Sequence, residues 1–213
     1  MSQARVKICG IRDLETALAA ADLGAAYIGF VSFEKSPRHL PISEAAQIAS
    51  QLGPKICKTA LVVDPSDDAL DAYLNEVPID MIQLHGHETP ERIEAIKTRY
   101  GLPIMKAVGI ADESDLAQLY DYIGVADQIL IDAKPPKGAD LPGGNGLRFD
   151  WRLLQNRRWS APWMLAGGLT PENASEAMML TGAQQLDVSS GVESAPGVKD
   201  IVKIRAFIEN AVL

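Results

Sequence analysis

Short apolar runs rich in β-branched residues alternate with longer amphipathic stretches along the whole chain. This alternation predicts an α/β protein with parallel strands joined by right-handed crossovers. Eight such units fit within 213 residues, which favours a (β/α)8 TIM barrel in a single domain, residues 1–213. An open doubly wound sheet is the alternative, but the fingerprint GxGxxG does not follow the first strand.

Each predicted strand is a short apolar run bounded by turn-forming residues. The expected strands are Val6–Cys9, Ala26–Phe33, Cys57–Val63, Asp80–Leu84, Ile104–Val108, Gln128–Asp132, Trp163–Ala166 and Leu186–Ser189. The helices are predicted where alanine, leucine and isoleucine recur at helical spacing. They are Leu14–Leu23, Ser43–Leu52, Asp67–Asn75, Pro90–Arg99, Glu113–Tyr122, Phe149–Leu154, Pro171–Thr181 and Asp200–Leu213.

The stretch Lys134–Gly146 carries three prolines and four glycines, so it forms neither a helix nor a central strand. It is either a surface linker or a loop that folds over a substrate and excludes water, as its place after the sixth strand favours.

Composition excludes several classes of function. The net charge is −8 and no stripe of lysine and arginine occurs, so we expect no nucleic-acid partner. No apolar run is long enough to span a membrane and no apolar leader follows Met1, so a cytoplasmic location is expected. The two cysteines, Cys9 and Cys57, lack metal-ligand spacing, so no metal site is expected. The sequence does not indicate the oligomeric state.

Two glycine- and serine-rich turns end the seventh and eighth predicted strands. They read Gly167-Gly168 and Ser189-Ser190-Gly191. Unpaired backbone N–H groups in such turns bind phosphate, and the corresponding loops of a β/α barrel often do so. The sequence therefore predicts a small phosphorylated substrate at the C-terminal end of the barrel.

Side chains alternate along a strand, so every second residue should face the barrel interior. In the first strand Lys7 and Cys9 should face inward, and Asp187 should do so in the eighth, next to it in a closed barrel. A buried charge requires a partner. We therefore expect Lys7 to pair with Asp187, and Lys106 to lie within reach of Asp132.

Cys9 and Asp132 end their strands on the interior side, where a thiol and a carboxyl group could act as base and acid on opposite sides of a substrate. An isomerisation needs this pair, because one proton is removed and another is added. A buried cysteine is otherwise a small core residue, as we expect for Cys57, and a strand-end aspartate often caps a helix. The residues after Asp132 are Ala-Lys-Pro-Pro, which start no helix at once.

Seven motifs in order carry a family resemblance over nearly the whole chain. They are Lys7-Ile8-Cys9-Gly10-Ile11, Gly29-Phe30 with Lys35-Ser36-Pro37-Arg38, Gln83-Leu84-His85-Gly86, Ile131-Asp132, Gly143-Gly144-Asn145-Gly146 with Phe149-Asp150-Trp151, Leu165-Ala166-Gly167-Gly168-Leu169 with Pro171-Glu172-Asn173, and Asp187-Val188-Ser189-Ser190-Gly191-Val192-Glu193. In this order the chain closely resembles phosphoribosylanthranilate isomerase, an enzyme family of tryptophan biosynthesis.

The resemblance implies a barrel that needs no metal or organic cofactor. It also implies an intramolecular oxidoreductase-type isomerase, which converts an aldose to a ketose by an Amadori rearrangement. Cys9 would be the general base and Asp132 the general acid, while Arg38 would hold the anthranilate carboxylate. Gly168, Ser190 and Gly191 would line the phosphate site.

The resemblance also bears on four further residues. His85 is either structural or part of the site, and His87 is expected on the surface. Glu34 and Asn145 depart from the family pattern; Glu34 should point away from an anionic substrate, and Asn145 should change little.

Two other functions stay open. One is a different phosphosugar isomerase or epimerase on the same barrel. An epimerase would require metal-binding histidines at the strand ends, and a related aminoaldose isomerase would have aspartate at both of the positions that Cys9 and Asp132 occupy here. The other is a phosphosugar-binding protein without activity, which would not need Cys9 and Asp132 together.

Overall fold

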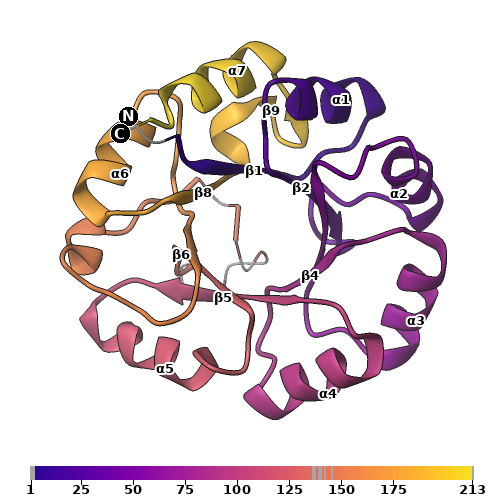
Figure 1. Cartoon of the computed structure of the whole chain (residues 1–213), viewed down its shortest axis with the longest axis horizontal. Coiled ribbons are helices and arrows are strands. Elements are labelled where there is room, and N and C mark those ends of the chain that lie inside the picture. The colour runs from indigo at the N-terminus through magenta and orange to yellow at the C-terminus, as the bar shows by residue number, and fades with distance from the viewer. Residues whose placement is uncertain (1–2, 136–137, 139–140, 142, 145, 213) are drawn as a thin grey trace.

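Strands β1 to β8 close into a parallel barrel in sequence order, and helices surround it (Figure 1). The structure, a computed structural model, describes residues 3–212 apart from 136–137, 139–140, 142 and 145. The strands are β1 (Arg5–Cys9), β2 (Tyr27–Ser32), β3 (Cys57–Val62), β4 (Met81–Leu84), β5 (Ile104–Ile110), β6 (Gln128–Ala133), β7 (Trp163–Leu165) and β8 (Gln185–Val188). The predicted (β/α)8 barrel is thereby confirmed.

The α-helices lie close to the predicted ranges. They are α1 (Leu14–Asp22), α2 (Ile42–Ala49), α3 (Asp67–Glu76), α4 (Pro90–Tyr100), α5 (Leu119–Tyr122), α6 (Ala174–Thr181) and α7 (Ile201–Asn210). Side-chain caps set several starts: Asp13 accepts a hydrogen bond of 2.7 Å from the Thr16 amide before α1, and Thr89 caps α4 directly before Pro90. Gly101 and Gly182 end α4 and α6 with positive φ angles.

Three predicted helices were wrong in part. The stretch after β5 is a 3-10 helix, η1 (Glu113–Gln118), that leads into the short α5, and the stretch predicted at 149–154 is the 3-10 helix η2 (Trp151–Leu154). The helix predicted from Pro171 begins only at Ala174. The chain after β8 first forms the 3-10 turn η3 (Ser190–Val192) and then a hairpin of β9 (Glu193–Ala195) and β10 (Val198–Lys199), which the sequence analysis missed.

The apolar core has an inner and an outer layer. A cluster of six buried apolar side chains lies in the barrel interior, and a much larger cluster packs between the strands and the helices. Val6 and Ile8 belong to the outer cluster, as strand parity predicts. The inner residues are Tyr27, Met105, Ala107, Leu130, Met164 and Ala166.

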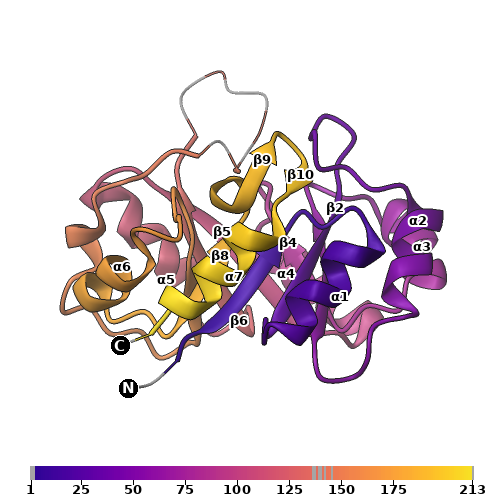
Figure 2. The same ribbon diagram turned by 90° about the horizontal axis from the view of Figure 1, so that it is seen from above.

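The chain ends meet at one end of the barrel. The Ala4 amide donates a hydrogen bond of 2.9 Å to the Ala211 carbonyl, and Gln3 forms a bridge with Val212. Figure 2 shows the β9–β10 hairpin at the opposite end from both termini. Within the described residues, no helix is long and apolar enough to cross a membrane.

The expected pairing of Lys7 with Asp187 is confirmed, with Nζ and Oδ1 2.9 Å apart. The register places the two residues directly opposite each other on β1 and β8. Lys7 is fully buried. Burial lowers its pKa, but the neighbouring Asp187 and Cys9 outweigh that effect, so the net pKa is raised and Lys7 carries its charge inside the barrel.

The expectation that Lys106 approaches Asp132 was wrong. Met105 and Ala107 point into the barrel, so Lys106 between them points outward. There its Nζ donates to Glu88 and to the Gly86 carbonyl, both at 2.7 Å, and it lies 5.4 Å from the centre of the Tyr122 ring.

Breaking the buried pair of Lys106 and Glu88 should destabilise the fold strongly. Both side chains are almost fully buried, so Lys106→Met leaves the Glu88 carboxylate without its counter-charge, at a cost of about 3–5 kcal/mol. Urea unfolding measures this loss. The control is Lys97→Met, which breaks a half-exposed pair with Asp127 and should cost less than about 1 kcal/mol. Equal losses in the two variants would contradict this assignment.

Candidate active site

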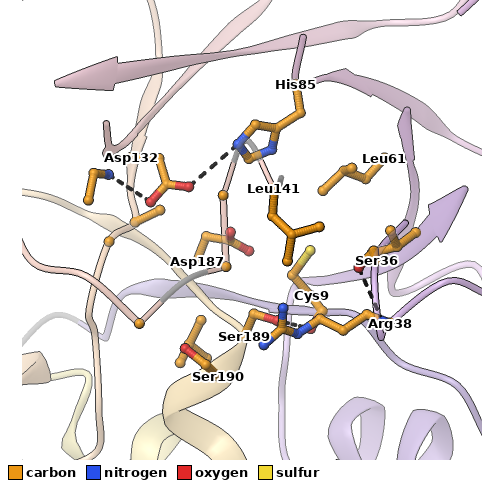
Figure 3. A pocket seen from close by; sticks show the side chains of 18 of the residues that line it. Cys9, Ser36, Arg38, Leu61, His85, Asp132, Leu141, Asp187, Ser189 and Ser190 are labelled. Atoms are coloured by element: carbon orange, nitrogen blue, oxygen red, sulfur yellow. Dashed lines mark hydrogen bonds and ion pairs between the residues drawn. The ribbon is translucent and has the colours of Figure 1, made fainter. Parts of the chain in front are cut away.

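A pocket opens at the C-terminal ends of the strands and gathers most of the predicted site residues (Figure 3). Polar side chains reach it from β1, β6 and β8 and from the segments that follow β2, β4 and β8. They belong to Cys9, Ser36, Arg38, His85, Asp132, Asp187, Ser189 and Ser190. Gly168 also lines it. Gly191 adjoins the pocket without being among its lining residues.

Cys9 is the last residue of β1 and is 5% exposed. An atom added at the Cβ position of Gly29 would lie 3.0 Å from both the Cys9 sulfur and Lys7 Nζ, so the thiol and the ammonium group converge over this glycine. Burial raises the pKa of the Cys9 thiol, while the charges of Lys7 and Lys199 act in the opposite direction. The ammonium group of Lys7 is thus a cationic neighbour of the Cys9 thiol.

Asp132 lies on β6 and is 7% exposed. Its Oδ1 accepts a hydrogen bond of 2.8 Å from the Ala133 amide, and its Oδ2 lies 3.5 Å from His85 Nε2. Asp132 caps no helix, since the residues described after β6 form an irregular segment. The other His85 nitrogen, Nδ1, is 3.1 Å from the Gln83 amide nitrogen. His85 therefore borders the acid as well as the pocket, which supports its assignment to the site.

Cys9 and Asp132 approach the cavity from different walls. Figure 3 shows Asp132 beside His85 on one side and the Cys9 sulfur on the other, with the Leu141 side chain pointing into the pocket between them. A small molecule in this space would have a thiol and a carboxyl group on separate faces. This arrangement suits proton removal at one atom and proton delivery at another.

Arg38 is buried rather than solvated, with 6% exposure. Its Nε and Nη2 donate to the two Glu193 oxygens at 2.8 and 2.9 Å, which forms a two-pronged ion pair. The Ser36 hydroxyl accepts a hydrogen bond of 3.1 Å from the Arg38 amide. The guanidinium thus belongs to the pocket wall, and Glu193 takes two of its donors.

The two glycine-rich turns lie against each other. Gly168 has a φ of +66°, where a side chain would be strained, and a Cβ there would lie 2.9 Å from the Leu147 carbonyl oxygen. A Cβ on Gly191 would collide with the Leu169 carbonyl oxygen. Asn173 secures the first turn: its side chain accepts from the Thr170 amide at 2.8 Å and donates to the Gly168 carbonyl at 2.9 Å.

The segment after β6 touches both walls of the pocket with consecutive glycines. An added Cβ at Gly143 would lie 2.6 Å from Asp132 Oδ2 and from His85 Nε2, and one at Gly144 would lie 2.7 Å from Arg38 Nη1. Only glycine permits so close an approach. Leu141, Gly143, Gly144 and Gly146 line the pocket.

The remaining predicted residues lie outside the pocket. Glu34 is exposed and does not line it, and the His87 side chain is 97% exposed. Cys57 is half-buried at the start of β3. Asn145 lies outside the described residues. Among the residues that the structure describes, no group of three or more His, Cys, Asp or Glu side chains could hold a metal ion.

Sequence reasoning missed Glu193 and Lys199 as parts of the site. Glu193 ended a quoted motif, but its partner Arg38 lies 155 positions earlier, and no local pattern links the two. Lys199 lies on β10, in a hairpin that the sequence analysis did not predict. The signal available was the presence of two charges in a short segment directly after the eighth strand.

β/α-barrel enzymes have their active sites at the C-terminal mouth, often with a phosphate site in the turns after the last two strands. A pocket at this mouth with a thiol, a carboxyl group and two glycine-rich turns therefore fits a barrel enzyme that acts on a phosphorylated substrate. The family model for N-(5'phosphoribosyl)anthranilate (PRA) isomerase matches residues 6–210. The chain belongs to this family.

Individual members of this family are similar to the chain over nearly its full length. The N-(5'-phosphoribosyl)anthranilate isomerase of Cereibacter sphaeroides (strain ATCC 17029) is 61% identical over 211 residues, which cover 99% of this chain and 100% of the relative. That of Paracoccus denitrificans is 60% identical over 206 residues, with 97% and 96% covered. The crystal structure of phosphoribosyl anthranilate isomerase from Thermotoga maritima superposes with a TM-score of 0.88 at 36% identity, covering 98% of each chain.

Gly191→Ala should disrupt the two glycine-rich turns, which are expected to bind phosphate. The new Cβ forces the turn after β8 away from the Leu169 carbonyl and so displaces the backbone N–H groups. We expect inorganic phosphate to raise the melting temperature of the unmodified protein and to raise that of the variant far less, as thermal unfolding with and without phosphate would measure. Gly53→Ala is the matched control, because no atom lies within 4 Å of the added Cβ. An unchanged phosphate effect in Gly191→Ala would contradict the assignment.

Proposed function

We propose that this chain converts N-(5'-phosphoribosyl)anthranilate into 1-(2-carboxyphenylamino)-1-deoxyribulose 5-phosphate, as an isomerase of tryptophan biosynthesis. The observation that carries the proposal is the position of Cys9 and Asp132 on separate walls of one pocket, with the two glycine-rich turns at its rim. The proposal places the whole reaction in one domain, residues 1–213, and a biosynthetic step of this kind is compatible with the predicted cytoplasmic location.

In the proposed reaction Asp132 donates a proton to the furanose ring oxygen. The bond from C1′ to that oxygen breaks, and its electron pair stays on the oxygen while the nitrogen lone pair forms the Schiff base. The Cys9 thiolate then removes the proton from C2′, and the electrons move to give an enolamine. Loss of the proton from the C2′ hydroxyl and protonation at C1′ give the ketone, so atoms and electrons balance without a redox partner.

Three groups bind the substrate in this proposal. The turns that contain Gly168, Ser190 and Gly191 bind the phosphate through backbone N–H groups. Arg38 binds the anthranilate carboxylate with the donors that Glu193 leaves available. Leu141 and the glycines after β6 cover the sugar and reduce its contact with water.

A crystal structure of a phosphoribosyl anthranilate isomerase in complex with reduced 1-(o-carboxyphenylamino)-1-deoxyribulose 5-phosphate supports the substrate class. It superposes on this chain with a TM-score of 0.83 at 34% identity and covers 98% of each chain. We infer that the pocket described above takes the same kind of phosphosugar.

Cys9→Ser and Asp132→Asn should each abolish most of the turnover, because each removes a proton-transfer group. A loss of about 10²–10⁴-fold in kcat is expected for each. Decay of the anthranilate-adduct fluorescence measures turnover. Cys57→Ser is the matched control, because Cys57 begins β3 whereas Cys9 ends β1 at the pocket.

The outcomes separate the possible failures. If the unmodified protein leaves the adduct intact, the substrate assignment is wrong. A phosphosugar-binding protein or another phosphosugar isomerase is then the better explanation of the site. If the unmodified protein consumes the adduct but both variants keep near-normal turnover, the substrate assignment is correct and the acid–base assignment of Cys9 and Asp132 is wrong.

The pH dependence of kcat/KM should follow the deprotonation of Cys9. Burial raises the pKa of this thiol, so the reactive thiolate is the minor form at neutral pH and its share grows as pH rises. In the Asp132→Asn variant, which lacks the titration of the proposed general acid, we expect the residual kcat/KM to increase between pH 7 and pH 9, by up to about tenfold per pH unit below that pKa. Above pH 7 the substrate phosphate is largely dianionic, so its own titration contributes little. A flat or falling profile of Asp132→Asn in this range would show that the thiolate is not the base.

A further inference from the structure

Glu193 fixes the orientation of Arg38 from a neighbouring element. It begins β9, directly after the phosphate-binding turn, and is 8% exposed. Its two oxygens occupy the Nε–Nη2 edge of the guanidinium, so the flat group cannot rotate without losing both hydrogen bonds. Of the five N–H donors of an arginine, three remain, on Nη1 and Nη2, and Nη1 lies beside Gly144 at the pocket wall.

Lys199 holds Glu193 in turn. Its Nζ donates to Glu193 Oε1 at 2.7 Å, to the Ser189 carbonyl at 3.1 Å and to the Ser189 hydroxyl at 3.2 Å. The Ser189 hydroxyl donates to the Cys9 carbonyl at 3.0 Å. A continuous series of hydrogen bonds therefore joins the end of β1, where the proposed base lies, to the arginine across the hairpin.

The charges of this cluster leave one positive charge without an internal partner. Arg38 and Lys199 are cationic and Glu193 is anionic, and all three side chains are nearly buried. Burial acts to raise the pKa of Glu193, but the two cations outweigh it and hold the pKa below its usual range. One buried excess cation at a pocket wall favours a ligand with one negative charge at that position.

We propose that Glu193, held by Lys199, is a positioning residue that aims Arg38 at the carboxylate of the substrate and so makes the pocket selective for an ortho-carboxylated aromatic amine. This rests on the proposed function. Without Glu193 the guanidinium would keep its charge but lose its fixed plane, and bidentate recognition of a carboxylate depends on that plane. The phosphate turns and the sugar would be unaffected, so the effect should be confined to the carboxylate.

The experiment compares two inhibitors that differ only in the carboxylate. One is reduced 1-(o-carboxyphenylamino)-1-deoxyribulose 5-phosphate, and the other is the phenylamino compound without the carboxyl group. Inhibition constants are measured for the unmodified protein and for Glu193→Gln, which keeps the size of the side chain but replaces the second acceptor oxygen with a donor that repels Arg38 Nη2.

Glu193→Gln should weaken the carboxylated inhibitor by about tenfold or more, since a charge-assisted hydrogen bond is at stake, and change the other by less than about twofold. In turnover assays KM should rise far more than kcat falls. In an Arg38→Ala background, Glu193→Gln should have no further effect on KM, because its target is already gone. Equal weakening of both inhibitors, or no weakening, would overturn the proposal.

Two variants complete the design. Glu34→Gln removes a negative charge from an exposed position outside the pocket and should leave both inhibition constants unchanged. Should Glu193→Gln not fold, Glu193→Asp tests the same point, since it keeps the carboxylate charge but shortens its reach to the guanidinium, and it should cause a smaller but equally selective loss.

Failure of this proposal differs from failure of the proposed function. If the unmodified protein neither turns over the anthranilate adduct nor binds the carboxylated inhibitor, the function is wrong. If it does both and Glu193→Gln shows no selectivity, only the role of Glu193 is wrong.

Discussion

The buried pair of Lys7 and Asp187 is the interaction on which the site depends. It joins β1 to β8, the two strands that close the barrel, and it lies directly beneath the thiol of Cys9. A hydrophobic pair would close the barrel as well, since burying two charges brings little net stability. The ion pair adds an ammonium group beside the thiol. Closure of the fold and the electrostatics of the proposed base thus share one contact.

Strand parity made much of this predictable from the sequence. It placed Lys7, Cys9 and Asp187 in the interior, and the structure puts them there. The same rule explains the error at Lys106, since Met105 and Ala107 face inward and the residue between them must face the helices. Its partner Glu88 comes from the segment before α4, and the strand pattern holds no information about such segments.

The rim of the pocket was less predictable than its floor. The glycine-rich turns were recognised from composition, but the β9–β10 hairpin was not, because its strands are too short to give a periodic pattern. The pairing of Arg38 with Glu193 depends on two segments 155 positions apart that meet only when the barrel closes. Residue types identified the chemistry of the site, whereas the closed fold determined which charges neutralise one another.

Three cations therefore lie at the pocket or next to it, and their charges are compensated to different degrees. Lys7 is matched by Asp187 alone, and its positive charge acts on Cys9 from below. Arg38 and Lys199 share one carboxylate, which leaves an excess positive charge at the rim. With a net charge of −8 the protein as a whole repels anions, so a phosphosugar with two anionic groups must be drawn in by local groups. In the proposed function the uncompensated charge at the rim would attract the carboxylate of the substrate and the backbone N–H groups of the turns would attract its phosphate, so the sugar between them would be oriented before any proton moves.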